Sequence, residues 1–375
     1  MARPLILGAG PAGCAAAVEL ARSGVSPTLL DRCATVGDPL CGGFMSWRTL
    51  SQLEALGIDL SDLGGQPVDR LRLFGRGTWV ETPLPRPSLG LSRHALDTRM
   101  RETATTAGAQ FAIDTIRGIS ASTAHGQRQD WHGESLFLAT GKHDVRGHSR
   151  PRQSEDPALG LRLRLPPGNA RRRLIGSAIE LHLFRGGYAG IVLQEGGSAN
   201  ICLALRKSAL ASAGGDPLTL LSRVAEDNAG FADRLGPDFS RARVESIGAV
   251  PYGWIAHETK PGLFRLGDQA AVIPSLAGEG MSIAVASGTM AARHWLQGGT
   301  GAAQAYQRAF AARAYRPVQM AKAARVLAET RLGAAAALAL ARLLPGLVID
   351  LAERCRIGRD SIQSDRATCT HARPC

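Results

Sequence analysis

The sequence is poor in residues that mark several classes of protein. Only 5% of its 375 residues are aromatic, and no basic cluster is interleaved with aromatic side chains. Because stacking rings beside basic residues are typical of nucleic-acid binding, this composition argues against a nucleic-acid partner. The net charge of +12 derives mainly from arginine, since only four of the 44 basic residues are lysine. Such a charge leaves open an acidic partner, an anionic cofactor or an anionic membrane surface.

The chain also lacks the cysteine spacings of a metal or disulfide protein. Its seven cysteines include no CxxC pair and no zinc-like spacing, so we expect no bound metal. An odd, scattered set is typical of free thiols in a reducing compartment. The first residues run directly into an apolar segment and a glycine turn, which leaves no room for a cleavable leader. We therefore expect a cytoplasmic protein.

The tail from about residue 300 is rich in alanine and arginine and contains an unbroken apolar run at Leu332–Ala341. The ten residues of this run are too few for a membrane-spanning helix, which needs about 20. We expect a helix that caps the neighbouring domain. The alternative is a helix lying on a membrane surface, which would need a charged face.

The start of the chain has the pattern of a dinucleotide-binding unit. An apolar run at residues 4–7 leads into a GxGxxG turn at Gly8, Gly10 and Gly13, then a helical segment and a second apolar run that ends in Asp31. In this order the glycines permit a tight turn, backbone approach to a pyrophosphate and close helix–strand packing. The helix N-terminus attracts phosphate, and Asp31 lies where a carboxylate binds ribose hydroxyls.

The middle of the chain predicts a second, β-rich unit. A hairpin over residues 68–84, a helix capped by Ser92 and a strand ending at Thr140–Gly141 complete the nucleotide-binding part. Strand-like alternation then dominates residues 150–260, which indicates an inserted antiparallel sheet. The run Arg171–Arg173 precedes one of these strands. It is either a solvated edge or a docking site for a phosphate-bearing substrate or carrier.

A second glycine-rich turn follows near residue 270. Gly267 and Asp268 end a predicted strand, and Gly278, Gly280 and Met281 lead into a helix. The acid suits a ribityl or ribose chain, which presents hydroxyl groups. Bare N–H groups at the start of a helix suit a flavin ring, because the ring gathers negative charge on reduction.

Together these motifs resemble those of FAD-dependent oxidoreductases of the para-hydroxybenzoate hydroxylase-like superfamily, and within it the branch of geranylgeranyl reductases and UbiH-type hydroxylases. The resemblance covers about residues 3–300 and includes Ser92–Arg93 followed by Asp97. It implies an α/β fold: a Rossmann-like FAD-binding domain, an inserted, mostly antiparallel β-sheet substrate domain and a C-terminal helical tail. The implied ranges are 1–150 and 245–300 for the FAD-binding domain (with an insertion at about 65–90), 151–244 for the substrate domain and 301–375 for the tail.

The resemblance also implies site residues. The first turn and Asp31 would hold the ADP half, Arg93 would lie beside the phosphates or the ring, and Ile116 would meet the adenine through its backbone. The expected FAD contacts are Gly8, Gly10, Pro11, Ala12, Gly13, Asp31, Arg32, Cys41, Arg93, Ile116, Thr140, Gly141, Gly267, Asp268, Pro274, Gly278, Gly280 and Met281. The candidate substrate-pocket residues are Cys41, Tyr188, Tyr252 and Trp254, the aromatic ones being equally consistent with packing between the two domains.

Two signatures bear on the reaction. Residues Pro39–Gly42 resemble the Pro-x-x-Cys-Gly motif of geranylgeranyl reductases, whereas Gly187–Leu193 keeps only the tyrosine of their Tyr-x-Trp-x-Phe-Pro motif. Cys41 is then either a small packing residue or a thiol near the redox centre. The mid-chain Asp-Gly motif of aromatic hydroxylases and the Trp-x-Trp-x-Ile-Pro motif of halogenases are not found. No second GxGxxG exists, so NAD(P)H would bind only transiently, as an electron donor.

The first hypothesis for the function is an NAD(P)H-driven monooxygenase acting on a hydrophobic aromatic or polyketide-like substrate. The second is a reductase that saturates an alkene of a prenyl or lipid substrate, and the third is a flavin-binding protein without turnover. In the first two the cofactor carries the difficult step, which accounts for the lack of a paired-carboxylate motif. The expected partner is a small hydrophobic substrate, with or without a carrier or phosphate group. Peripheral membrane contact through the C-terminal helices is a further alternative.

Overall fold

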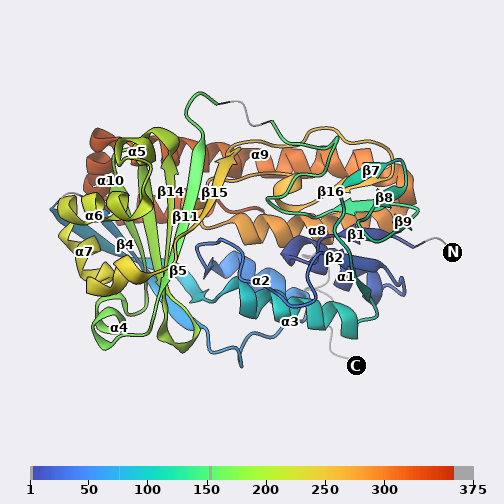
Figure 1. Cartoon of the computed structure of the whole chain (residues 1–375), viewed down its shortest axis with the longest axis horizontal. Helices are drawn as coiled ribbons and strands as arrows, with labels where there is room; N and C mark the ends of the chain where they lie inside the picture. The colour runs from blue at the N-terminus through green and yellow to red at the C-terminus, as the bar shows by residue number, and fades with distance from the viewer. Residues whose placement is uncertain (1–2, 76, 152–153, 359–375) are drawn as a thin grey trace, which may run out of the picture.

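The computed structural model describes residues 3–75, 77–151 and 154–358. Five short parallel strands form sheet A in the order β16, β10, β1, β2, β6 (Figure 1). These strands are Leu263–Arg265, Leu136–Leu138, Leu5–Leu7, Thr28–Asp31 and Gln110–Ile113. Both faces of sheet A are covered, as expected for a parallel sheet. The Rossmann-like arrangement predicted from the first thirty residues is confirmed.

Alternate residues of β1 pack into two different cores. Ile6 belongs to the core formed with α1 (Pro11–Arg22) and α8 (Gly280–Gly298). Leu5 and Leu7 face the opposite side, where Ala124 and Trp131 of a small sheet C pack against them. This alternation follows from the two-residue period of a strand. Helix α3 (Arg93–Thr106) lies beside α1, and α2 (Trp47–Ala55) packs near α8.

Sheet C consists of β7 (Gly118–Ser120), β8 (Thr123–His125) and β9 (Asp130–His132), which form an antiparallel meander. No pattern in the sequence predicts this sheet. Its strands have three residues each and carry mostly polar, partly exposed side chains, so they show little hydrophobic alternation.

Sheet B has eight strands in the order β15, β11, β14, β13, β12, β4, β5, β3. Their bounds are Glu245–Val250, Ala158–Leu165, Ala199–Arg206, Gly187–Leu193, Ala178–Phe184, Gln66–Gly75, Thr78–Gly90 and Phe44–Met45. Neighbouring strands are antiparallel except for β12 and β4, which are parallel. The predicted mostly antiparallel sheet is therefore confirmed.

The two edges of sheet B come from segments that the sequence analysis groups with the FAD-binding part. The hairpin β4–β5 forms as predicted but pairs with β12 rather than with sheet A. Strand β15 pairs with β11. Alternation of apolar residues identifies a strand but says nothing about its partner, which is why these pairings could not be assigned.

Short helices cover one face of sheet B and leave the other facing the centre of the molecule. The covering helices are α4 (Asn169–Ile175), α5 (Lys207–Ser212), α6 (Pro217–Asp227) and α7 (Ala229–Leu235). Arg171 of α4 is buried, and its guanidinium donates to the carbonyl oxygens of Pro166, Arg234 and Leu235. Of the predicted basic run, only Arg172 and Arg173 are exposed.

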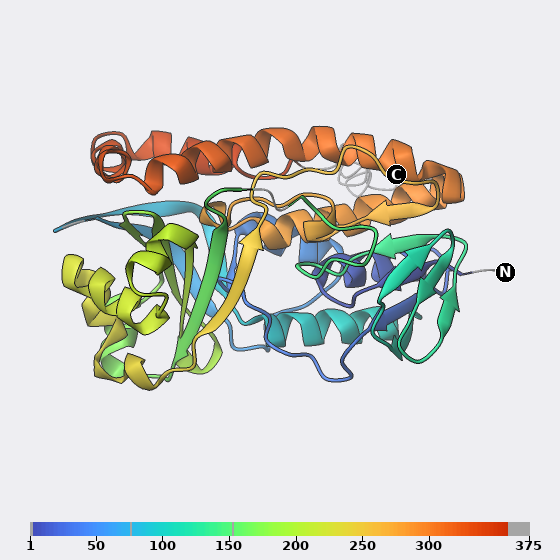
Figure 2. The ribbon, with the colours of Figure 1, turned by 45° about the horizontal axis from the view of Figure 1, so that its top comes forward.

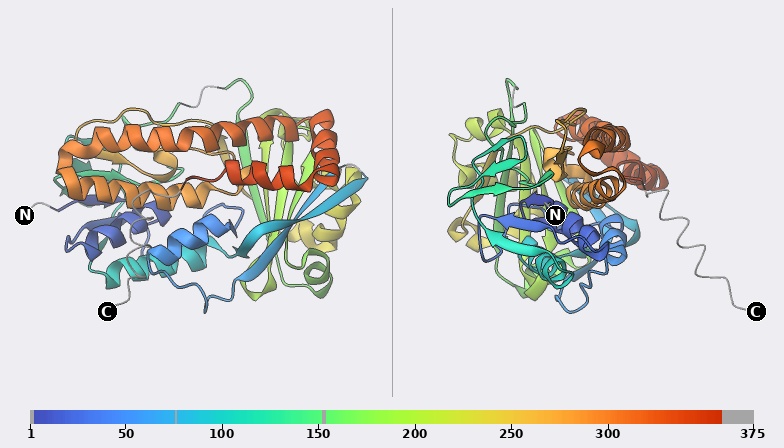
Figure 3. Two further views of the ribbon diagram at one scale, coloured as in Figure 1. Left: turned by 180° about the vertical axis from the view of Figure 1, so that it is seen from behind. Right: turned by 90° about the vertical axis from the view of Figure 1, so that its right-hand side faces the viewer.

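The predicted C-terminal helical region is confirmed as α9 (Ala303–Ala328), α10 (Arg331–Leu343) and α11 (Pro345–Arg354). Helix α9 runs along the molecule over both sheets (Figures 2 and 3). Helix α10 packs on strands β4, β5 and β12. In the described part of the chain no single helix is long and apolar enough to cross a membrane. The pair α10 and α11 passes that test only together, and it is bent by 114°.

Candidate functional site

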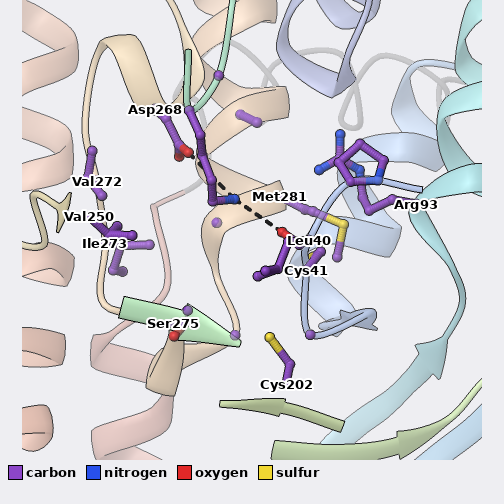
Figure 4. Close-up of a pocket in the computed structure, with 18 of the residues that line it drawn as sticks. Leu40, Cys41, Arg93, Cys202, Val250, Asp268, Val272, Ile273, Ser275 and Met281 are labelled. Atoms are coloured by element: carbon purple, nitrogen blue, oxygen red, sulfur yellow. Dashed lines mark hydrogen bonds and ion pairs between the residues drawn. The ribbon is translucent and has the colours of Figure 1, made fainter. Parts of the chain in front are cut away.

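A cavity of about 1630 Å³ lies between sheet A, the inner face of sheet B and helices α9 to α11. The residues that follow β1, β2, β10 and β16 all line it. These are the carboxyl ends of the parallel strands, where open α/β sheets bind their ligands. Figure 4 shows Asp268, Arg93 and Met281 around the cavity, with Cys202 and Ser275 nearer sheet B.

The first turn can be made only by glycine at two positions. Gly8 has φ 114°, and a Cβ there would lie 2.4 Å from the Ala139 carbonyl oxygen. A Cβ on Gly13 would lie 1.9 Å from the Gly8 carbonyl oxygen. Gly8 therefore permits contact between β1 and the end of β10, and Gly13 permits contact between α1 and its own turn. These are the packing roles predicted for the motif.

Gly10 differs because it faces open space. Its φ of −84° is accessible to any residue, and a Cβ would meet only the guanidinium of Arg93, at 3.5 Å. Gly10 is the N-cap of α1 and no side chain caps this helix. Backbone N–H groups at such a helix start attract anions. The turn thus offers an approach for a pyrophosphate.

Asp31 braces the same turn. Its carboxylate accepts hydrogen bonds from the backbone N–H of Ala9, at 2.9 Å, and of Cys33, at 3.0 Å. The side chain is 20% exposed and lines the cavity, so it can also accept from a ligand hydroxyl. Its expected contact with ribose stays a prediction.

A fixed positive charge lies beside Gly10. Arg93 donates two hydrogen bonds to Asp97, at 2.7 and 2.6 Å, one helical turn along α3. Burial alone would lower the pKa of Arg93, but the Asp97 carboxylate raises it above its usual value. The pair holds the guanidinium at the cavity wall, where we expect a cofactor phosphate or ring.

The second turn carries an ion pair that the sequence analysis missed. Lys142 Nζ lies 3.9 Å from Asp268 and donates to the Leu40 carbonyl oxygen at 3.3 Å (Figure 4). Lys142 directly follows the predicted Thr140–Gly141 turn, so its place in the chain was the available signal. Lys142 joins the Thr140–Gly141 turn and the second glycine turn to the loop that contains Cys41.

That loop is fastened to sheet B. Asn200 donates to the carbonyl oxygens of Cys41, at 3.1 Å, and Gly42, at 2.8 Å. The pKa of the Cys202 thiol, two residues further along the same strand β14, is raised to about 12 by burial, so this thiol stays protonated at neutral pH. Cys14, Cys33, Cys41, Cys202 and Cys355 are free thiols, and Cys369 and Cys375 lie outside the described residues.

The start of α8 is anchored by the end of the helical region. Glu279 is fully buried, pairs with Arg356 and has one carboxylate oxygen without a hydrogen-bond partner. Arg356 also lies 4.2 Å above the ring of Trp47. Burial raises the pKa of Glu279. The sequence gives no signal for this pair, because its members are 77 residues apart.

Two tyrosines converge on one serine in the half of the cavity next to sheet B. Tyr188 Oη lies 2.6 Å from Ser275 Oγ, and Tyr252 Oη lies 3.0 Å from the same atom. Burial raises the pKa of Tyr188 well above its usual value and that of Tyr252 to about 12. Both phenols therefore stay protonated at neutral pH and can donate hydrogen bonds.

The cavity brings together nearly all of the predicted site residues. Three do not line it: Gly13, Pro274 and Trp254. Gly13 acts in packing, as described above. Trp254 forms a backbone pair with Val272 instead, so the structure gives it no place at the cavity wall.

Comparison with known proteins agrees with this geometry. Residues 2–127 match the family model described as an FAD binding domain. The chain is 26% identical over 335 residues to menaquinone reductase of Mycobacterium tuberculosis, spanning 77% of this chain and 75% of that protein. The chain is also 26% identical to the menaquinone reductase of Mycolicibacterium smegmatis, and the match spans 79% of this chain and 76% of that protein.

Solved structures share the fold at lower identity. The flavin-dependent brominase Bmp2 has a TM-score of 0.72 at 14% identity, covering 99% of this chain and all of the other. PqsL of Pseudomonas aeruginosa, in complex with 2-aminobenzoylacetate, has a TM-score of 0.68 at 16% identity, covering 89% of this chain and 98% of PqsL. A geranylgeranyl bacteriochlorophyll reductase-like protein of Thermoplasma acidophilum has a TM-score of 0.67 at 16% identity, covering 94% of this chain and 99% of that protein.

The residues at the cavity fit FAD. The glycine cradle leaves backbone N–H groups open at α1, the start of α8 likewise has no side-chain cap, and Arg93 supplies a fixed cation beside Gly10. With the match of residues 2–127 to an FAD binding domain, these features identify the chain as an FAD-dependent oxidoreductase, and its fold is shared with Bmp2 and the geranylgeranyl bacteriochlorophyll reductase-like protein.

Proposed function

We propose that the protein is an FAD-dependent reductase that saturates a carbon–carbon double bond in a long, apolar substrate of the prenyl-lipid class. A hydride and a proton add across the double bond, and a reductant of the NAD(P)H class supplies the two electrons. FAD, when bound, provides the hydride-transfer chemistry, and the chain binds, orients and shields the substrate.

The lining of the cavity carries this proposal. The cavity of about 1630 Å³ includes both glycine turns, so it has to hold FAD as well as the substrate. Its lining residues from β4, β5 and β12 and from helices α9 to α11 are all apolar: Leu71, Leu73, Leu84, Ile179, Leu181, Leu183, Met320, Ala321, Ala323, Ala324, Leu327, Ala328, Gly333, Ala336, Ala337, Leu340, Val348, Leu351 and Ala352. Such a wall favours an extended hydrocarbon chain over a small polar molecule.

A polar cluster borders this apolar region. Ser275, which belongs to the second glycine turn, bonds to the phenols of Tyr188 and Tyr252, and these two rings pack in one cluster with Leu181, Leu183 and Ala328 of the apolar wall. Protonated phenols can donate a hydrogen bond to a substrate oxygen or hold the proton that the double bond takes up. The surrounding apolar side chains exclude water and so strengthen these contacts.

The named relatives support the same substrate class, because two of them are menaquinone reductases. A second candidate is oxygen transfer to an aromatic head group. It is supported by the shared fold of PqsL, whose structure holds the aromatic compound 2-aminobenzoylacetate.

An anaerobic assay separates the two reactions. The FAD-loaded protein is incubated with menaquinone, dispersed in detergent, and NADH or NADPH, and the products are examined by mass spectrometry. The proposal predicts a mass gain of two hydrogens in the prenyl chain without oxygen. If product forms only in air and contains an oxygen atom from labelled dioxygen, the protein is a monooxygenase and the reductase proposal is wrong.

Replacing Tyr188 with phenylalanine tests the polar cluster. The Tyr188→Phe variant keeps the ring that packs in the core but loses the hydroxyl that lies against Ser275. We expect kcat to fall by about 100-fold, the lower end of acid–base contributions, with unchanged FAD content. Tyr315→Phe, at an exposed position outside the cavity, is the control. Equal kcat in both variants would remove Tyr188 from the mechanism.

A further inference from the structure

Large apolar side chains gather on the outer surface of the C-terminal helices. Leu332 is 86% exposed, Leu343 76%, Leu327 59% and Leu344 55%. Together with Val326 and Leu347 they form what we call the apolar face: Val326, Leu327, Leu332, Leu343, Leu344 and Leu347. Exposed patches of this kind mark interaction sites.

Helix α10 is apolar on its outer side as well as on its inner side. Gly333, Leu338 and Ala341 are buried. The exposed stripe, at spacings of three and four residues, consists of Leu332, Ala335, Ala336, Ala339 and Leu343. A helix facing water is expected to carry polar residues on such a stripe. The outer side of α10 is therefore built for an apolar environment.

The apolar face adjoins the opening of the cavity. Leu327 and Ala336 both line the cavity and are exposed. The cavity thus reaches the outer surface between α9 and α10, beside the apolar face. Figure 3 shows α10 at the end of the molecule that contains sheet B, with α11 turning back alongside α9.

The charges at the border of the apolar face are mainly basic. Arg331 and Arg342 are the charged residues of α10, and Lys322 of α9 is also exposed. Helix α11 carries Asp350, which is paired with Arg354 at 2.6 Å, and the half-buried Glu353, so the basic excess comes from α9 and α10. Basic residues around exposed leucines match the interface of an anionic bilayer.

We propose that the apolar face docks onto the surface of an anionic lipid bilayer, so that the cavity opens toward the hydrocarbon and takes its substrate directly from the lipid. The apolar face enters only the surface layer of the bilayer, as a peripheral contact, because the bent pair α10 and α11 does not form one straight spanning helix. Only the route of the substrate rests on the proposed reductase function. Docking itself rests on the surface alone.

A second copy of the chain is a less suitable occupant. A two-fold axis through the apolar face would bring Arg331 and Arg342 of one copy close to the same residues of the other. Like charges in such an interface cost free energy, whereas an anionic headgroup layer neutralises them.

Vesicle sedimentation of the FAD-loaded protein tests the proposal. The probe is a vesicle of phosphatidylglycerol and phosphatidylcholine, compared with phosphatidylcholine alone. We expect binding to the anionic vesicles that weakens with salt, and a fall of at least about tenfold in the Leu332→Asp/Leu343→Asp variant. The control is Leu174→Asp/Leu296→Asp, which changes two leucines exposed elsewhere and should bind like the parent protein.

Three outcomes overturn docking: no binding to anionic vesicles, equal binding by the Leu332→Asp/Leu343→Asp variant, or self-association of the parent protein that this variant abolishes without any vesicle binding. Because vesicle binding needs no turnover, it stands or falls separately from the reductase activity. If the route is right, the variant also loses activity on substrate in vesicles but not on substrate in detergent.

Discussion

The Gly10→Val variant is expected to fold normally and to lose FAD. The backbone of Gly10 has ordinary angles, and a Cβ would make one contact of normal length with Arg93. The protein itself therefore tolerates the side chain, and we expect the free energy of unfolding without cofactor to change by less than about 1 kcal/mol. The added methyl groups would occupy the space through which a pyrophosphate approaches the turn. Affinity for FAD should fall on the order of 100-fold, measured by fluorescence titration.

Two further variants serve as comparisons for FAD affinity and for stability. Gly301→Val lies outside the cavity, and a Cβ there meets nothing within 4 Å, so FAD affinity should stay unchanged. Gly8→Val combines a φ of 114° with a clash against Ala139, so it should lose stability as well as FAD. Full FAD affinity in Gly10→Val would show that the dinucleotide lies elsewhere.

The Ala337→Trp variant is expected to act only on substrates with short hydrocarbon chains. Ala337 lines the apolar part of the cavity from α10. An indole there fills space that we assign to the hydrocarbon chain, while the two glycine turns keep their geometry. In detergent, kcat/KM for a long-chain substrate should fall by about 10- to 100-fold, whereas a short-chain analogue should lose little, because only the long chain meets the new ring.

Ala335→Trp is the matched control, since Ala335 is exposed on the outer stripe of the same helix and does not line the cavity. We expect it to act on both substrates like the parent protein. Equal losses for long and short substrates in Ala337→Trp would contradict the placement of the hydrocarbon chain.

Local patterns could be predicted from the sequence because nearby residues decide them. The Gly8–Gly13 turn depends on contacts within one strand–turn–helix unit. The Ser92 cap depends on a hydrogen bond to the backbone N–H of Ala95, three residues on. Strands β11 and β12 of sheet B alternate apolar and other residues, so each could be recognised as a strand from its own sequence.

Long-range contacts could not be predicted. The pairing of β4 with β12, the Glu279–Arg356 ion pair and the Lys142–Asp268 ion pair each join segments more than 70 residues apart. No local spacing encodes such a partner. The burial of Arg171 could not be predicted either. A run of arginines is usually exposed to solvent, and the carbonyl groups of Arg234 and Leu235 that accept hydrogen bonds from Arg171 are distant in sequence. Burial of the Tyr188 and Tyr252 phenols against Ser275 likewise emerges only from the fold.

The flavin content of the gently isolated protein, or of the protein soaked with FAD and desalted, tests the central claim most directly. Two glycine turns far apart in sequence should enclose one FAD per chain, visible as a yellow protein with a flavin absorption spectrum. A folded protein that stays colourless after soaking, or that holds a different molecule between Gly10 and Gly280, would contradict the account.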